Sequence, residues 1–450
     1  MKAIVNLSET LGRIKPMHAV NNGPVYKFSS DQRITNLQAF KEAGIPYART
    51  HDASFCSTYG GEHTVDVNFI FQNFDADPYD PASYDFALTD EYMKIIKLGG
   101  SEIFYRLGSK IEHQSKKYNT LPPKDFHKWA VICEHIIKHL NYGWADGHEF
   151  GIKYFEIWNE PDMAPDDSKD KKTWGGTEKE FFEFYDVAAT HLKKCFPELK
   201  IGGPALCCNQ EWAERFIKQL KAPLDFFSWH AYGHEVMQFV ESSEKVRRLL
   251  DENGFENTEN ILDEWNYVRG WTGDEWIYSL KTEKNHKGAA LISSVMLELQ
   301  KSDVDMLMYY DARPCGMNGL FGEIVSEKLK GYYAIYMFGE LYKLGVETAS
   351  KADGRLSVCS AKNDRGDKAA VMLSYFDDDD NAKSEKVCVE IKGLAPDTLH
   401  TFEIYLLDER HDFALLSTFA ADGSHCAYEM PLEPNSVLFI KLADSQVQSA

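Results

Sequence analysis

Up to about residue 345, short apolar runs alternate with longer segments whose apolar residues recur at helical spacing. Such alternation is typical of parallel strands joined by helices. The predicted strands are Ile14–Val20, Ile45–Asp52, Glu102–Leu107, Tyr154–Trp158, Lys200–Gly203, Phe226–Tyr232, Asn260–Trp265 and Asp305–Asp311. Predicted helices include Ser30–Ala43, Lys124–Leu140 and Thr177–Cys195. The pattern predicts an α/β fold, a (β/α)₈ TIM barrel, which we place at residues 13–344.

Beyond residue 345 the pattern changes to short strands separated by turn signals. The predicted strands here are Leu356–Ala361, Lys368–Tyr375, Glu385–Ile391, Thr401–Asp408 and Ser436–Leu442. They predict an accessory antiparallel β-sandwich domain over residues 345–450. An acidic run at 377–380 lacks the glycine and the distant glutamate of a helix-loop-helix calcium site, so we expect a solvated hairpin loop.

The fourth predicted strand of the barrel ends in a carboxylate. Residues 154–158 are apolar and aromatic as a run, which predicts a strand buried on both faces. Pro161 cannot continue the strand, so Glu160 is left at its carboxyl end, where parallel α/β proteins build active sites. We expect the aromatic neighbours to desolvate this carboxyl group partly, which would suit a general acid.

A second carboxylate ends the seventh predicted strand. Asp263 and Glu264 follow the apolar pair Ile261-Leu262 and precede Trp265. Because neighbouring residues of a strand point to opposite faces, only one of the two acids should enter the barrel mouth. Two carboxyl groups at the ends of two strands are what glycoside hydrolysis requires, one to donate a proton and one to attack or to activate water.

Several segments, in order along the chain, resemble motifs of one enzyme family. Asn159-Glu160-Pro161 resembles the acid/base signature of the clan A retaining glycoside hydrolases. The whole set is most similar to glycoside hydrolase family 39, which includes β-xylosidases and α-L-iduronidases. The other matching segments are residues 47–52, 200–205, 225–232 and 331–342. The resemblance extends over the barrel, and it implies that residues 1–12 contribute the first strand of the sandwich.

The resemblance also implies roles for the matching residues. Glu160 would be the acid/base and Glu264, which the register of the motif selects over Asp263, the nucleophile. Asn159 would bind the 2-hydroxyl group of the sugar. The other residues expected to line the site, from the second and sixth strands, are Arg49, His51, His230 and Tyr232.

The eighth predicted strand departs from the clan pattern. Many clan A enzymes carry a tryptophan there as a floor for the first sugar, whereas this chain has Tyr310, Asp311 and Arg313 nearby. Tyr310 would take the place of the tryptophan. Asp311 and Arg313 would either bind sugar hydroxyls or pair with each other.

Composition narrows the partners. The net charge of −21 disfavours nucleic acid and anionic membranes, because both would repel the chain. Nine scattered cysteines do not resemble a disulfide framework, no apolar run approaches a membrane span, and no secretory signal is visible. We therefore expect a cytoplasmic enzyme of oligosaccharides or glycosides, without cofactor or metal, and leave open a homo-oligomer.

The substrate remains open at this stage. The best prediction is an exo-acting β-D-xylosidase, with the loops 108–123 and 161–176 closing a pocket around the terminal sugar. A β-glucosidase, an α-L-arabinosidase and an α-L-iduronidase are alternatives, and in the last the uronate would need a cation such as Arg49 or Arg313.

Two other protein classes also stay open. One is a carbohydrate-binding barrel without catalysis. The other is a metal-dependent hydrolase, since metal sites in barrels use ligands that converge from strand ends. Its candidate ligands are His51, Asp52, His230 and Asp311.

Overall fold

The computed structural model describes residues 1–26, 34–53, 63–207 and 209–444. Eight parallel strands close into a barrel in which each strand bonds to the next and the last returns to the first. The strands are β2 (Ala19–Asn21), β3 (Tyr47–Arg49), β4 (Glu102–Leu107), β5 (Tyr154–Ile157), β6 (Lys200–Leu206), β7 (Phe226–Gly233), β8 (Glu259–Tyr267) and β9 (Met306–Tyr309). The predicted α/β barrel is confirmed.

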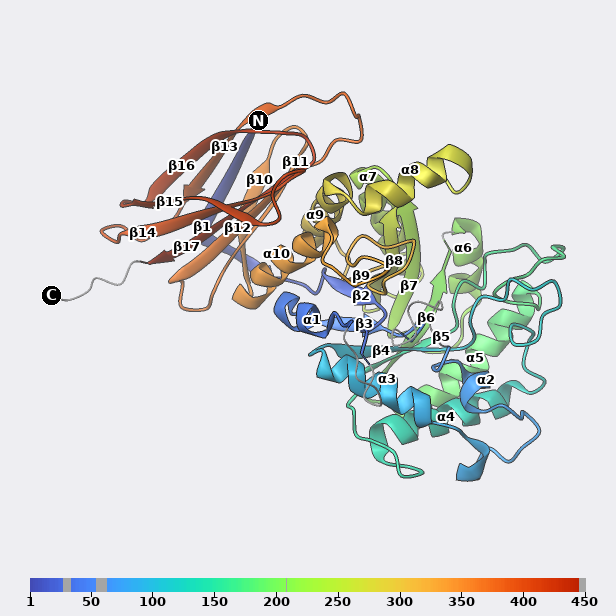
Figure 1. Ribbon diagram of the computed structural model, residues 1–450. Coiled ribbons are helices and arrows are strands. Elements are labelled where there is room, and N and C mark those ends of the chain that lie inside the picture. The colour runs from blue at the N-terminus through green and yellow to red at the C-terminus, as the bar shows by residue number, and fades with distance from the viewer. Residues whose placement is uncertain (27–33, 54–62, 208, 445–450) are drawn as a thin grey trace.

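Helices surround the barrel (Figure 1). They are α1 (Leu37–Ala43), α2 (Val67–Ile70), α3 (Ala87–Leu98), α4 (Phe126–Tyr142), α5 (Glu178–Cys195), α6 (Gln210–Gln219), α7 (Val236–Asp251), α8 (Gly273–Glu283), α9 (His286–Gln300) and α10 (Lys330–Leu344). The start of α5 illustrates how the sequence fixes where a helix begins. Thr177 and Glu180 form a capping box that satisfies the first free N–H groups of the helix. Within the described ranges, no helix combines the length and the apolar character that crossing a bilayer requires.

Some barrel strands are shorter than the sequence predicted. The first begins at Ala19 instead of Ile14, and the eighth ends at Tyr309 instead of Asp311. Pro16 has no N–H to donate to a neighbouring strand, and Ile14 bonds instead to the carbonyl of Gly345, outside the barrel.

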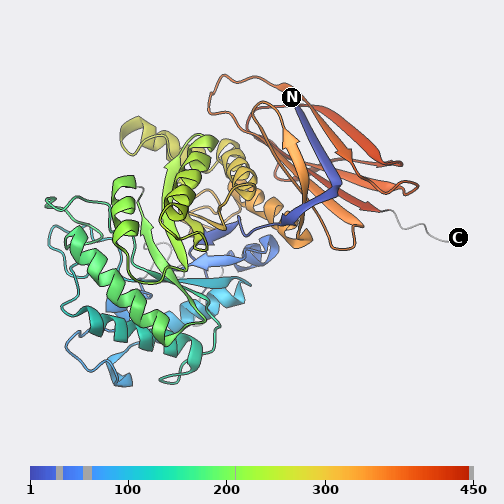
Figure 2. The same ribbon diagram turned by 180° about the vertical axis from the view of Figure 1, so that it is seen from behind.

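A second sheet of nine strands lies beside the barrel. Its spatial order is β15-β14-β17-β12-β11-β10-β1-β13-β16, and only the β1–β13 pair is parallel. The bounds are β1 (Lys2–Arg13), β10 (Val346–Ala352), β11 (Leu356–Lys362), β12 (Lys368–Tyr375), β13 (Glu385–Lys392), β14 (His400–Leu407), β15 (Ala414–Ala421), β16 (His425–Leu432) and β17 (Ser436–Asp444). Figure 2 shows the blue amino-terminal strand among the orange and red ones.

This sheet folds back on itself. Phe419 of β15 and Tyr428 of β16 stand at opposite edges of the strand order, yet their rings stack with centroids 5.9 Å apart. Between the two halves lies an apolar core to which β1, β12, β13, β14 and β17 all contribute. The arrangement is a sandwich, and the bulges of β1 near Asn6 and Thr10 let that strand bend.

The sandwich packs against α9 and α10 (Figure 1). The Ser374 hydroxyl donates to the carbonyl of Ala290, and Lys441 pairs with Glu340. Buried side chains of β11, β12 and β17 join the core that these helices share with the barrel. A rigid support on one side of the barrel follows from this shared core.

The acidic run at 377–380 differs from the predicted solvated loop. Asp377 is buried, with 7% of its surface exposed, and the Asp378 carboxylate accepts hydrogen bonds from Tyr267 (2.7 Å) and Arg269 (2.7 Å). The expected solvated loop is therefore wrong for these two residues. Basic and hydroxyl groups of the barrel compensate the buried charge, and the loop ties the sandwich to the end of β8.

Candidate active site

The two predicted catalytic carboxylates lie together. Glu160 follows β5 and Glu264 lies within β8, and each has 5% of its surface exposed. A carboxylate oxygen from each and a ring nitrogen of His230, on β7, all lie within 4.8 Å of one another. His230 Nδ1 is 2.8 Å from Glu160 Oε1 and 3.5 Å from Glu264 Oε2. The barrel thus places one imidazole between two acids.

The backbone around Glu160 is held in an unusual conformation. Trp158 and Glu160 have φ of 76° and 50°, in the left-handed region that side-chain-bearing residues rarely adopt. Hydrogen bonds fix it: the Glu160 N–H donates to the Ala205 carbonyl, and the Thr173 hydroxyl donates to the Glu160 carbonyl. Strained backbone of this kind concentrates at functional sites, where the surrounding structure over-determines it.

Glu264 is surrounded by donors. Arg49 Nη1 lies 2.7 Å from its Oε1, and the Tyr232 hydroxyl donates to Oε2 at 2.9 Å. Burial by itself raises the pKa of Glu264, but the positive charges of His230 and Arg49 outweigh it and lower the pKa to about 2. The carboxyl group is therefore ionised at neutral pH, as a nucleophile must be.

The neighbouring charges shift the pKa of His230 in the opposite direction to that of Glu264. Burial lowers the pKa of its imidazole, but the carboxylates of Glu264 and Glu160 more than compensate and hold that pKa above its usual value. Its cationic form is stabilised while both acids stand beside it. The charges of both acids therefore act on the same imidazole.

Arg49 organises the floor of the site. It is fully buried, and it donates to Glu156 at 2.8 Å, to Asn159 Oδ1 at 2.7 Å and to Asn21 Oδ1 at 2.9 Å, besides Glu264. Because the Asn159 oxygen is engaged by Arg49, its amide nitrogen points elsewhere. In the described part of the chain this buried Nδ2 has no hydrogen-bond partner, so it is a donor available to a ligand.

Both acids of the β8 pair contact Arg49, contrary to expectation. In the pairing of β7 with β8, Trp229 faces Leu262 and His230 faces Glu264, so Asp263 is skipped. This bulge breaks the alternation of faces, and Asp263 Oδ2 comes 3.0 Å from Arg49 Nε. The prediction that only one acid enters the barrel is wrong.

Asp263 and Glu156 share the Arg49 guanidinium. Burial, reinforced by the Glu156 carboxylate, raises the pKa of Asp263 well above its ordinary value. Burial also opposes ionisation of Glu156, but the charge of Arg49 and the hydrogen bond from the Ser228 hydroxyl lower the pKa of Glu156. The protonated form of Asp263 is therefore favoured, which reduces the negative charge in the core.

Two residues that contact Arg49, Asn21 and Glu156, were not predicted from the sequence. One signal was present, because Glu156 stands alone in an apolar strand, and a buried carboxylate needs a compensating cation. The pattern did not show that this cation is Arg49. It also did not show that Asn21 reaches Arg49 from β2.

The residues predicted from the second and eighth strands form a neighbouring cluster. Arg313 Nη1 lies 3.0 Å from Asp52 Oδ2, and His51 Nδ1 lies 3.3 Å from the same oxygen. The His51 ring also meets the Tyr310 ring edge-on, with centroids 6.1 Å apart. Burial raises the pKa of Asp311, which lies 3.7 Å from Arg313, to about 7. Arg313 thus pairs with acids, one of the two roles expected for it.

The four candidate ligands of a metal-dependent hydrolase do not meet in one group among the described residues. His230 faces Glu160 instead, and Asp52 is paired with Arg313. Asp311 accepts from the backbone N–H of Arg313 and contacts Cys315 Sγ at 3.5 Å. This arrangement gives the metal-dependent alternative no support.

An aromatic pair, the exposed Trp271 and the half-buried Trp276, lies next to Tyr232. Trp271, between β8 and α8, has 56% of its surface exposed, and its ring lies 5.1 Å from that of Tyr232 at 76°. It stacks on Trp276, with centroids 5.4 Å apart. Since Tyr232 donates to Glu264, this apolar surface begins one side chain away from the nucleophile candidate. Nothing in the strand pattern singled it out.

Comparison with known proteins places this geometry in a family. Residues 9–302 match the family described as "Glycosyl hydrolases family 39", which confirms the resemblance drawn from the motifs. A β-xylosidase of Caldicellulosiruptor saccharolyticus is 30% identical over 244 residues, 52% of this chain and 46% of that protein. The chain thus spans about half the length of this curated relative.

Two solved structures share the fold. A glucosidase from Croceicoccus marinus superposes with a TM-score of 0.80 at 22% identity, over 99% of each chain. A GH39 enzyme from Xanthomonas axonopodis pv. citri gives a TM-score of 0.73 at 16% identity, over 99% of this chain and 97% of that one. Both comparisons extend over the barrel and the sandwich together.

Proposed function

The chain belongs to glycosyl hydrolases family 39, and from this premise we propose that it is a retaining glycoside hydrolase acting on terminal sugars. The observation that carries the proposal is the pair Glu160 and Glu264, with carboxylate oxygens within 4.8 Å. Retaining enzymes hold their two carboxyl groups about 5–5.5 Å apart, whereas inverting enzymes leave about 6.5–9.5 Å for a water molecule. This upper limit, which joins one oxygen of each group, supports the closer retaining arrangement and direct attack.

In the first step Glu264 attacks the anomeric carbon while Glu160 protonates the leaving oxygen. Glu264 is already ionised, and Arg49 and Tyr232 orient it through one hydrogen bond to each oxygen. In the second step Glu160 removes a proton from water, which attacks the anomeric carbon and releases Glu264 from the ester.

His230 connects the two steps. Its contact with Glu160 holds a proton between imidazole and carboxyl, and its pKa is raised in part by the charge of Glu264. When Glu264 becomes an ester, that charge disappears and the cationic imidazole loses stabilisation. The same loss removes the repulsion between the two carboxylates, so Glu160, once it has given its proton to the leaving group, can remain ionised and act as the base on water.

We infer exo action from two loops at the carboxyl ends of β4 and β5. The Glu112 N–H donates to the carbonyl of Lys172, and the Gly175 N–H donates to that of Thr120. These bonds join the loops 108–123 and 161–176 into a continuous wall. A wall at one side of the site supports a closed pocket for a terminal sugar over an open cleft for a polymer.

The substrate that we propose is a β-D-xyloside, supported by the similarity to a β-xylosidase. A β-glucoside is the second candidate, because the structurally similar protein from Croceicoccus marinus is a glucosidase. A uronide has less support: Arg49 and Arg313, the cations that could bind its carboxylate, are already paired with acids.

A panel of nitrophenyl glycosides tests the proposal. It should include β-xylose, β-glucose, β-galactose, α-L-arabinose and uronic acids, with the Glu264→Ala variant as the blank. We expect the highest kcat/KM with β-xylose. A preference for uronides would contradict the substrate, and an equal lack of hydrolysis by the wild type and Glu264→Ala would instead favour a carbohydrate-binding barrel.

A further inference from the structure

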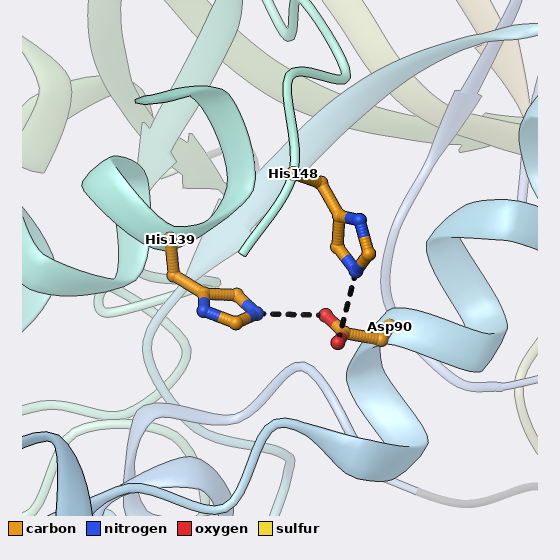
Figure 3. A group of neighbouring side chains, drawn as sticks. All are labelled: Asp90, His139 and His148. Atoms are coloured by element: carbon orange, nitrogen blue, oxygen red, sulfur yellow. Dashed lines mark hydrogen bonds and ion pairs between the residues drawn. The ribbon is translucent and has the colours of Figure 1, made fainter. Parts of the chain in front are cut away.

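A second group of converging polar side chains lies on the outer helices. Asp90 is in the first turn of α3, His139 is in the last turn of α4, and His148 is in the segment that follows α4. Figure 3 shows both imidazole rings directed at the one carboxylate. These residues play no part in the chemistry proposed above.

The donor atoms are close enough to share one ion. His139 Nε2 lies 3.0 Å from Asp90 Oδ1, and His148 Nε2 lies 3.0 Å from Asp90 Oδ2. One ligand atom from each residue falls within 4.8 Å of the others. Ligands bound to zinc at about 2.0–2.1 Å in a tetrahedron stand a little over 3 Å apart, so the spacing needs little adjustment.

The outer contacts of His139 favour a ligand role. Its Nδ1 is 2.9 Å from the carbonyl of Trp144, which can only accept, so Nδ1 carries a hydrogen. In the neutral ring the lone pair of Nε2 then faces the Asp90 carboxylate, an arrangement that is repulsive unless a cation lies between them. A histidine that donates its other N–H to a carbonyl is the usual supporting arrangement around bound metals.

His148 supplies an independent observation. Its Nε2 is buried and, within the residues that the structure describes, makes no properly directed hydrogen bond despite its 3.0 Å approach to Asp90. Such a nitrogen lacks a partner that one ion on the Asp90 side would provide. The edge of the group remains open, since the side chain of His148 is 24% exposed and that of Asp90 17%. Water can complete the coordination there.

We propose that Asp90, His139 and His148 bind one divalent transition metal ion, with Zn²⁺ the best match for two imidazoles and a carboxylate. The ion fastens the start of α3 to the end of α4 and has a structural role. The alternative is that no metal ion binds and that ion pairs between the two imidazoles and Asp90 hold the group together.

Zinc titration of the full-length, chelator-treated protein tests the site. We expect one equivalent bound through this group and a higher Tm with Zn²⁺. His148→Ala should weaken that binding at least about tenfold, since loss of even an outer-shell partner costs about 10- to 100-fold. Hydrolysis of a nitrophenyl glycoside by His148→Ala should match the wild type, which shows that the variant is folded.

His191→Ala is the matched control. Glu134, His191 and Cys195 form another group with metal-binding atoms on the outer helices, and this variant should bind zinc as the wild type does. With Co²⁺ as the probe, the visible absorption of the bound ion should be lost in His148→Ala and kept in His191→Ala. No binding by the wild type, or equal affinity in His148→Ala, overturns the proposal. If neither result can be read because His148→Ala does not fold, His148→Gln replaces it under the same criteria.

Discussion

Arg49 Nη1 lies 2.7 Å from Oε1 of Glu264, and both side chains are buried. The pair is part of a larger charge balance, because the same guanidinium also contacts Glu156 and Asp263. A buried carboxylate without this cation would hold its proton and lose nucleophilicity. The contact therefore links the stability of the barrel to the chemistry of its site.

Replacing Arg49 by Gln should lower both the stability of the barrel and the activity of its site. Removing one partner of a buried ion pair costs about 3–5 kcal/mol, because the remaining charge is uncompensated. Denaturant unfolding measures this loss, and the acid limb of kcat/KM should move to higher pH as the pKa of Glu264 rises. Arg215→Gln is the control: that arginine is 46% exposed and pairs with Glu178, so it should change stability by only about 0–1 kcal/mol. A loss of stability of similar size in both variants would contradict the role of Arg49 as the cation that compensates the buried carboxylates.

In the roles proposed for them, Glu160 and Glu264 should differ in kinetics. Glu160→Ala should keep the first step with a good phenolate leaving group and gain rate with added azide, because azide replaces the activated water. Glu264→Ala should be nearly inactive on every substrate, since no covalent intermediate forms. Steady-state rates with and without azide separate the two roles.

NMR of the first product of the wild type should show the same anomeric configuration as the substrate, and initial inversion would exclude the double displacement.

Tyr232→Phe should weaken catalysis without unfolding the protein. The lost hydrogen bond to a charged group is worth about 1.5–3 kcal/mol, which corresponds to about a 10- to 100-fold drop in kcat/KM if it acts in the transition state. The pKa of Glu264 should also rise, moving the acid limb upwards. A pH profile of kcat/KM measures both effects. An unchanged profile would mean that Tyr232 does not act on Glu264.

Stability should depend on pH through Glu264. The pKa of this group in the folded protein, about 2, is below that of an exposed glutamate, about 4.3. The stabilisation is therefore complete above the unfolded pKa and is lost as the pH falls through the folded one. We expect the free energy of unfolding to decrease from about pH 4.5 down to about pH 2. Glu264→Gln should flatten this part of the curve, and equal slopes in both proteins would contradict the assignment.

Trp271→Ala should affect sugars beyond the first. A sugar face that lies on this ring buries apolar surface, worth about 25 cal/mol per Å², so burial of about 30–50 Å² gives about 1 kcal/mol. KM for an oligosaccharide should therefore rise about 3- to 10-fold with little change in kcat. Methyl glycosides, which do not reach this surface, should be unaffected. Ile277→Ala is the control, because that residue is 50% exposed on the nearby helix and has no ring. Equal effects of the two variants would argue against stacking.

The sequence alone determined the barrel and its two acids, because both depend on local pattern. The alternation of apolar runs and helical stripes marks parallel strands, and Asn159-Glu160-Pro161 marks the end of one. Asn159, His230 and Tyr232 followed from the same ordered motifs. The structure places His230 beside Glu160, Tyr232 beside Glu264, and Asn159 on the arginine that also binds Glu264.

Only the tertiary structure decided the charge balance beneath the acids. A bulge in β8 turns Asp263 inwards, and a bulge depends on how two strands pair, which the sequence of one strand does not reveal. Asp378 is engaged for a similar reason: its partners Tyr267 and Arg269 are more than a hundred residues away and meet it only when the sandwich packs on the barrel. Burial makes a charge need a partner, and the fold alone determines which one is within reach.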